Sequence, residues 1–123
     1  MDKKALIINA LDKESYNNCH IKGSINVPLE MLRFYADNLD KNQEIIVYCA
    51  RYECPISKHA YKLLKQLGFT NVRAYEGGII EWFKKGYPVE GVCTSDALKH
   101  TTNKQPPEEG IETITAEELI KKL

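Results

Sequence analysis

The stretch "IIVYCARYECPISKHAYKLL", residues 45–64, carries the pattern from which the fold can be predicted. Its first four residues are apolar or aromatic and predict a buried strand that leads into Cys49. Pro55 is typical of the first residue of a helix, because its missing N–H is not needed there. The residues between Cys49 and Pro55 must therefore turn tightly from a strand into a helix.

Apolar runs alternate with helical spacing along the rest of the chain. Apolar residues at helical intervals predict helices beginning near Leu32, ending before Gly68 and starting again at Ile79. Strands that alternate with helices and are apolar on both faces indicate a parallel sheet. We therefore predict an α/β fold with a central, mostly parallel sheet of four to five strands and helices on both faces. The further strands are expected at 4–11, 24–29 and 71–78.

The composition of the chain argues against several classes of function. The chain has 123 residues, which fits one domain, and its 17 basic and 17 acidic residues cancel. This balance argues against a protein that binds nucleic acid or a membrane surface through bulk charge. No apolar run approaches the length of about 18 residues that spans a bilayer. The apolar run near the N-terminus is interpreted as a strand and not as a signal peptide, so a cytoplasmic location is expected.

The turn after Cys49 has features of a reactive thiol site. Successive amides in such a turn can form a nest for an anion, and the N-terminus of the following helix adds positive potential. A thiolate in that setting has a lowered pKa and is a better nucleophile, and Arg51 can add a full positive charge. The alternative is that Cys49 is an inert core thiol, since free cysteine is often buried.

Two other chemistries fit the loop poorly. A cysteine-dependent phosphatase or arsenate reductase needs an arginine at the far end of the loop to hold a tetrahedral oxyanion, but Cys54 and Pro55 stand there. A zinc site needs about four ligands in paired spacing. Cys49, Cys54, His59 and Cys93 form no such pattern, so no metal is expected.

Three motifs around the loop resemble the single-domain rhodanese family of sulfurtransferases. They are "HIKGSINVPL" (20–29), "IIVYC" (45–49) and "GFTNVRAYEGGIIEWFKKGYPVEG" (68–91), and the resemblance covers residues 4–91. It implies that the Cys49 thiolate takes sulfane sulfur from a donor such as thiosulfate, becomes a persulfide and passes the sulfur to cyanide, a thiol or a protein. It implies no metal and no organic cofactor. The cradle of backbone amides would be the loop Ala50, Arg51, Tyr52, Glu53 and Cys54.

The sequence departs from the usual family pattern at several positions. The loop lacks the usual glycine and the arginine or serine near its end, and it resembles a subset with a CxxxxCP loop. Cys54 is either a resolving thiol that forms a disulfide with Cys49 or a small residue near the helix start. Asn9 and Ala10 stand where the family usually has Asp and Arg, so the usual ion pair is absent.

Three side chains outside the loop complete these expectations. His20 is expected to have a structural role, packed near the sheet. Cys19 and Cys93 receive no role, because four unevenly spaced cysteines do not indicate a disulfide scaffold. Cys19 is expected to be partly buried and Cys93 to lie in a linker.

The chain is predicted to contain a rhodanese-like domain (1–91), a linker (92–110) and a C-terminal strand–helix segment (111–123). Thr115 and Glu118 have the spacing of a capping box. The family usually begins with such a segment, so 111–123 is expected to fill that place beside the strand at 71–76. It would do so in its own chain, as a circular permutation, or in a neighbour, as a homodimer that exchanges 111–123. Otherwise it is a tail helix that docks elsewhere.

The favoured function is sulfur transfer through Cys49. The first alternative is a thiol redox switch that uses a Cys49–Cys54 disulfide, and the second is a non-catalytic module that binds proteins. The donor and acceptor depend on side chains such as Arg51, Tyr52 and Glu53, which family membership does not fix.

Overall fold

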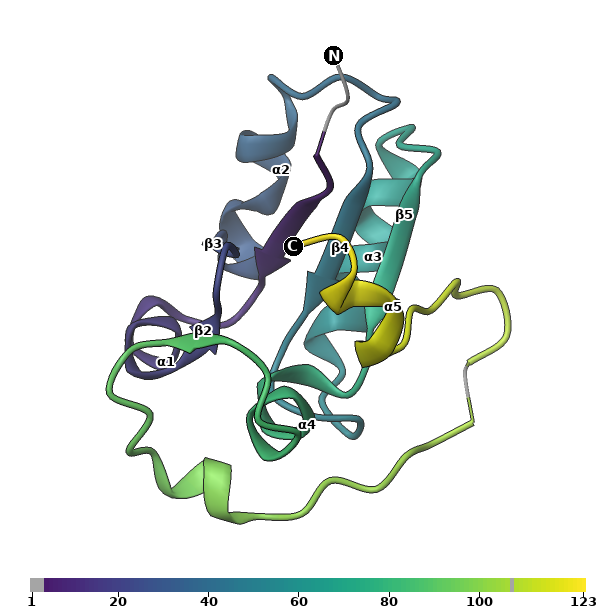
Figure 1. Cartoon of the computed structure of the whole chain (residues 1–123). Coiled ribbons are helices and arrows are strands. Elements are labelled where there is room, and N and C mark those ends of the chain that lie inside the picture. Colours follow the sequence, from purple (N-terminus) through teal and green to yellow (C-terminus); the bar gives the residue numbers. More distant parts are fainter. Residues whose placement is uncertain (1–3, 107) are drawn as a thin grey trace.

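Four parallel strands form the central sheet, as predicted (Figure 1). The computed structural model describes residues 4–106 and 108–123. The strand order is β3-β1-β4-β5, so the strand that leads to Cys49 is an inner one. The strands are β1 (Leu6–Asn9), β3 (Ile25–Asn26), β4 (Ile45–Tyr48) and β5 (Val72–Tyr75).

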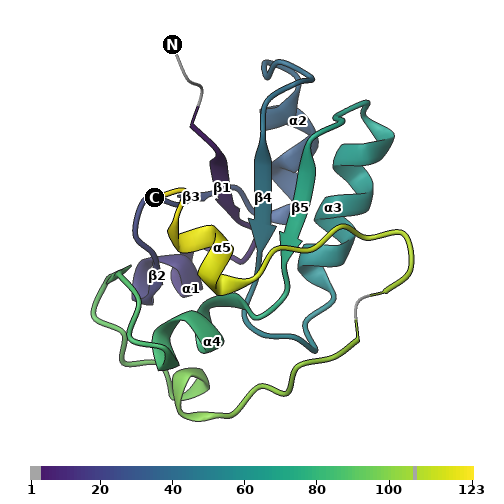
Figure 2. The ribbon, with the colours of Figure 1, turned by 45° about the vertical axis from the view of Figure 1, so that its right-hand side comes forward.

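Helices cover both faces of this sheet (Figure 2). Alternation along β4 decides the two faces: Ile45 and Val47 pack in one apolar cluster, while Ile46 and Tyr48 pack in the other. The first cluster includes side chains of α2 (Leu32–Ala36) and α3 (Ile56–Gln66). The second includes side chains of α4 (Gly78–Lys84) and α5 (Ala116–Ile120).

Several short elements were not predicted. An antiparallel pair joins β2 (His20–Ile21) to β6 (Val89–Glu90). Each strand has two residues, which is too short for alternation to be recognised in the sequence. The remaining short elements are α1 (Lys13–Asn18) and the 3-10 helices η1 (Leu29–Met31) and η2 (Asp96–Lys99).

The helix after the cysteine loop begins and ends close to its predicted bounds. Pro55 immediately precedes α3 instead of being its first residue, a shift within the usual uncertainty of a helix start. Gly68 follows the helix with a φ of 98°, the left-handed conformation that ends many helices.

The C-terminal segment lies beside β5 of its own chain, at the sheet edge where it was expected (Figure 2). The Ala74 N–H donates to the Glu112 carbonyl (2.9 Å), and the Ile114 N–H donates to the Ala74 carbonyl (3.1 Å). The predicted capping box of Thr115 and Glu118 is present. The circular permutation and the exchange of this segment between chains both stay predictions.

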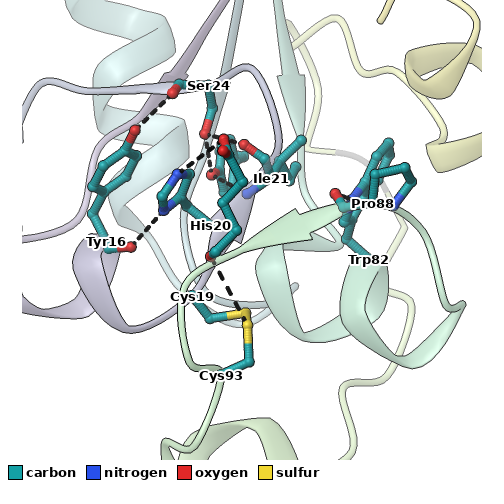
Figure 3. Close-up of polar contacts among 10 residues, drawn as sticks. Tyr16, Cys19, His20, Ile21, Ser24, Trp82, Pro88 and Cys93 are labelled. Carbon is teal, nitrogen blue, oxygen red and sulfur yellow. Dashed lines mark hydrogen bonds and ion pairs between the residues drawn. A yellow bond between two sulfur atoms is a disulfide. The ribbon is translucent and has the colours of Figure 1, made fainter.

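The residues 92–106 are attached to the domain although they have little regular structure. Leu98 in η2 is buried in the same cluster as α4 and α5. Cys93 forms a disulfide with Cys19, with 4.6 Å between their Cα atoms (Figure 3). The sequence assigned no role to these two cysteines and did not predict their pairing, because the fold brings together residues 74 positions apart. We refer to residues 92–106 as the strap.

Replacing Leu119 by Ala tests whether the C-terminal segment contributes to stability. Leu119 is fully buried, so the substitution is expected to lower the free energy of unfolding by about 2–5 kcal/mol. Leu123 is 50% exposed, and Leu123→Ala should change the free energy of unfolding by only about 0.5 kcal/mol. Urea unfolding measures both. Equal, small effects of the two substitutions would show that docking of residues 111–123 does not contribute to the stability of the protein.

Reduction of the disulfide should destabilise the protein. Opening the Cys19–Cys93 bond releases a long closed loop in the unfolded chain, which typically lowers the free energy of unfolding by about 2–4 kcal/mol. Urea unfolding with and without a dithiol reductant measures the change. A variant with Cys19→Ser and Cys93→Ser should not respond to the reductant, and an equally large response in that variant would contradict the assignment.

Candidate active site

The loop from Cys49 to Pro55 connects the carboxyl end of β4 to the start of α3. Sites of open parallel α/β sheets usually form at such strand ends. The Ile79 N–H donates to the Cys49 carbonyl and the Ile80 N–H donates to the Ala50 carbonyl, both at 3.0 Å. The first turn of α4 therefore fixes the start of the loop through two backbone hydrogen bonds.

Gly78 allows this close contact. Its φ is 68°, in the left-handed region. A Cβ at this position would collide with the Ala50 carbonyl group and approach the Arg51 nitrogen to 2.6 Å. Glycine at 78 therefore satisfies a backbone conformation and a contact distance that a larger residue cannot.

Cys49 points into the protein and is fully buried. Its thiol donates to the Cys54 carbonyl, with 3.6 Å between sulfur and oxygen. The adjacent Cys54 thiol group and burial both raise the pKa of Cys49, while hydrogen bonds from Ser57 oppose that rise. Cys49 is therefore a protonated thiol in the resting site.

Cys54 is the half-buried, more acidic thiol of the pair. The hydrogen bond from Cys49 lowers the pKa of Cys54 to about 6, with further help from the backbone N–H groups of Ala50 and Ile56 and from the Arg51 charge. Burial acts in the opposite direction but is outweighed. Near neutral pH the negative charge of the pair therefore lies on Cys54.

This corrects the prediction that Cys49 has the lowered pKa. Two features of the loop explain the difference. The Cys54 N–H donates to the Arg51 carbonyl (3.1 Å), a turn that brings Cys54 back over Cys49. The expected inward nest of amides is also incomplete, because the Tyr52 N–H donates to Thr102 in the strap. Arg51 contributes charge as expected, although its nearest ion-pair partner is Glu53 (3.6 Å).

The strap contacts the outer side of this loop. The Tyr52 N–H donates to Thr102 Oγ1 (2.9 Å), and the Asn103 N–H donates to Glu53 Oε1 (3.1 Å). These contacts join residues about 50 positions apart, so sequence pattern alone gives no sign of them. Figure 1 shows the strap passing α4 on its way to the C-terminal segment.

A polar cavity adjoins the loop at Tyr52. The Tyr52 hydroxyl donates to Glu81 Oε2 (2.8 Å), and the Tyr75 hydroxyl donates to Glu81 Oε1 (2.7 Å). Burial and the Glu81 charge raise the pKa of both tyrosines, so both stay protonated donors. The cavity, of about 330 Å³, lies between this network, the strap and the C-terminal segment; its charged lining residues are Glu76, Glu81, Lys85, Lys104 and Glu117.

The strand–loop–helix arrangement around Cys49 agrees with a comparison with protein families. The Rhodanese-like domain family matches residues 1–85, more than two-thirds of the chain. This chain belongs to the rhodanese family.

Within the described residues, no three His, Cys, Asp or Glu side chains gather where they could hold a metal ion. No helix in the same residues is long and apolar enough to cross a membrane.

Several relatives of this rhodanese chain have names that state an activity. A protein from Shewanella oneidensis named thiosulfate sulfurtransferase GlpE is 31% identical over 65% of this chain and 77% of its own length. A protein of the same name from Coxiella burnetii is 30% identical over 77% of this chain and 81% of its own. The match to an HTH-type transcriptional regulator of Mycobacterium tuberculosis, 27% identical over 68% of this chain, covers only 37% of that protein.

Two solved structures superpose on most of this chain. A Bacillus halodurans protein has a TM-score of 0.68 and 32% identity, covering 74% of this chain and 66% of its own. An Escherichia coli structure described as rhodanese with anions has a TM-score of 0.57 and 28% identity, covering 71% of this chain and 98% of its own. The rhodanese-like fold is therefore shown by structure as well as by sequence.

The rhodanese motif at 20–29 has a structural explanation. The Tyr48 hydroxyl accepts a hydrogen bond from the Ile21 N–H (3.0 Å) and shares one with Ser24 Oγ (2.8 Å). Burial raises the pKa of Tyr48 to about 12, so the hydroxyl stays neutral. The motif thus connects to the strand residue immediately before Cys49.

His20 has the structural role that was predicted. Its ring stacks on Tyr16 (3.7 Å between centroids), and Nδ1 is 2.8 Å from the Tyr16 carbonyl oxygen (Figure 3).

Asn9, which replaces the usual family Asp, is buried and accepts a hydrogen bond from the Leu11 N–H (2.9 Å). It shapes the turn after β1 without any charge.

Thiol alkylation as a function of pH tests the order of the two pKa values. The thiolate is the nucleophile, so the rate with iodoacetamide should rise as the pH passes about 6 and level off near neutrality. Cys54→Ser should remove this step and leave only the slower reaction of Cys49 at alkaline pH. A wild-type rate that follows an ordinary thiol, with a pKa of about 8.5, would contradict the assignment.

Proposed function

We propose that this rhodanese chain is a sulfurtransferase that moves sulfane sulfur from a donor such as thiosulfate to a thiol, cyanide or protein acceptor through a persulfide on Cys49. One observation carries the proposal: Cys49 lies at the carboxyl end of β4, against the first turn of α3, in a member of the rhodanese family. The relatives named thiosulfate sulfurtransferase support the choice of donor.

Cys54 supplies the base for the first step. The Cys49 proton passes to the Cys54 thiolate through the contact between the two sulfur groups. The transfer is uphill because Cys54 is the more acidic thiol, so the reactive Cys49 thiolate is a minor species that the attack consumes. The resulting Cys49 thiolate attacks the sulfane sulfur of thiosulfate, a sulfur–sulfur bond forms, and sulfite leaves with the electron pair of the broken bond. Ser57, whose N–H and hydroxyl both hydrogen-bond to Cys49, stabilises the thiolate and then the persulfide at the helix N-terminus. The chemistry requires no metal or organic cofactor.

A thiol redox switch is the second candidate function. The observation that favours it is the direct contact of Cys49 with Cys54, which leaves the two thiols within reach of a disulfide. The third interpretation, a non-catalytic protein-binding module, has no comparable support, because it gives no reason for a buried thiol beside an acidic one. A small donor and a thiol or protein acceptor remain the proposed partners, with no nucleic acid and no membrane.

The Cys19–Cys93 disulfide bears on the proposed cytoplasmic location. Disulfides persist in oxidising compartments and are rare in the cytosol, where thiols are kept reduced. In the cytoplasm this pair would therefore exist largely as two thiols. The proposed location predicts that protein trapped by rapid alkylation inside cells carries labels on Cys19 and Cys93.

Sulfur loading identifies the nucleophile. Wild type, Cys49→Ser and Cys54→Ser are treated with thiosulfate at alkaline pH, and the released sulfite and the intact masses are measured. We expect sulfite from wild type and Cys54→Ser and none from Cys49→Ser, because only Cys49 accepts the sulfur. Sulfite production by Cys49→Ser at the wild-type level, or no sulfite from wild type, would refute the proposal.

A further inference from the structure

We infer that the loop completes the reaction internally: Cys54 attacks the Cys49 persulfide, releases sulfide and leaves a Cys49–Cys54 disulfide. The inference rests on the proposed function, since it begins from the persulfide. It adds a second activity, the reduction of thiosulfate to sulfite and sulfide, and it makes Cys54 a catalytic residue of that reaction.

The turn of the loop provides the geometry. The Cys54 N–H donates to the Arg51 carbonyl (3.1 Å), which folds the end of the loop back toward its beginning. Cys49 Sγ then lies 3.6 Å from the Cys54 carbonyl oxygen and in direct contact with the Cys54 thiol group. The two cysteines are thus neighbours before any reaction, and the five-residue separation within one turn suits the short Cα distance that a disulfide needs.

The two sulfur atoms have different environments that suit different roles. Cys49 is completely buried, so a persulfide on it is shielded from bulk water. Cys54 is half-buried and receives the N–H groups of Ala50 and Ile56, which hold its thiolate beside the persulfide. Thiol–disulfide exchange proceeds by attack of a thiolate on a neighbouring sulfur. Cys54 is therefore the nearest nucleophile to the bound sulfur.

The strap favours an internal acceptor over a large external one. Thr102 and Asn103 bond to Tyr52 and Glu53 on the outer side of the loop, and the disulfide of Cys93 attaches the strap to the domain. A bulky protein acceptor has to compete with these contacts. Cys54 does not, because it belongs to the same loop and already contacts Cys49.

The reaction balances in atoms, charge and electrons. The Cys49 persulfide anion and the Cys54 thiol become the Cys49–Cys54 disulfide and hydrosulfide. The bond between Cys49 Sγ and the outer sulfur breaks, the outer sulfur leaves with both electrons and the Cys54 proton, and a bond forms between the two cysteine sulfurs. The sulfane sulfur is reduced and the two cysteines are oxidised. A small dithiol then reduces the disulfide by two exchange steps and becomes a cyclic disulfide.

A single-turnover experiment tests the inference. The full chain is reduced, freed of reductant under anaerobic conditions and mixed with thiosulfate, and sulfite, sulfide and intact mass are measured. Wild type should release one sulfide with each sulfite and lose two hydrogens in mass, with the new bond mapped to Cys49 and Cys54. Cys54→Ser, assayed at alkaline pH, should release sulfite, retain the added sulfur, and lower sulfide to background.

This experiment distinguishes failure of the internal step from failure of the sulfurtransferase proposal. Wild type that releases sulfite but keeps the added sulfur, without sulfide, overturns the internal step and leaves the sulfurtransferase proposal standing. Absence of sulfite from wild type overturns both. Sulfide release from Cys54→Ser at the wild-type level also overturns the internal step. The matched control is a variant with Cys19→Ser and Cys93→Ser, which should release sulfide as wild type does; loss of sulfide there would assign the resolving role to the other cysteine pair.

Discussion

The contact between the first turn of α4 and the cysteine loop is the constraint on which the rest of the site depends. Two N–H groups, of Ile79 and Ile80, hold the carbonyls of Cys49 and Ala50, and Gly78 alone permits that approach. With the start of the loop fixed, its turn has to fold back over Cys49. The same contact explains why glycine stands at position 78, since the backbone there takes a left-handed conformation and the loop approaches it closely.

Within that frame the two cysteines divide the acid–base work. The interaction with Cys54 and burial raise the pKa of Cys49 and keep it protonated, whereas the hydrogen bond from Cys49, N–H groups and Arg51 lower the pKa of Cys54 and favour its thiolate. In the proposed reaction the Cys54 thiolate of the same loop accepts the proton of the buried nucleophile, so no histidine or metal is required. The departure from the usual loop therefore does more than replace an arginine, because it places a second sulfur beside the first.

Sequence pattern was sufficient for most of the fold and only part of the site. The apolar run before Cys49, the motifs at 20–29 and 68–91 and the capping box at Thr115 each depend on neighbours in sequence, and each was predicted correctly. The two-residue strands β2 and β6 were missed because they exist through pairing with each other. The pKa order of Cys49 and Cys54 was missed because it depends on which amides point at which sulfur, which spacing does not encode.

The sequence by itself determined the family, the parallel sheet, and the position of Cys49 at a strand end, since local periodicity and short motifs specify these. Tertiary structure alone decided the Cys19–Cys93 disulfide, the hydrogen bonds of the strap to Tyr52 and Glu53, and the register in which residues 112–114 pair with Ala74 of β5. These contacts join residues roughly 40 to 75 positions apart in the chain. Folding must bring the partners together before distance, burial and charge can act between them.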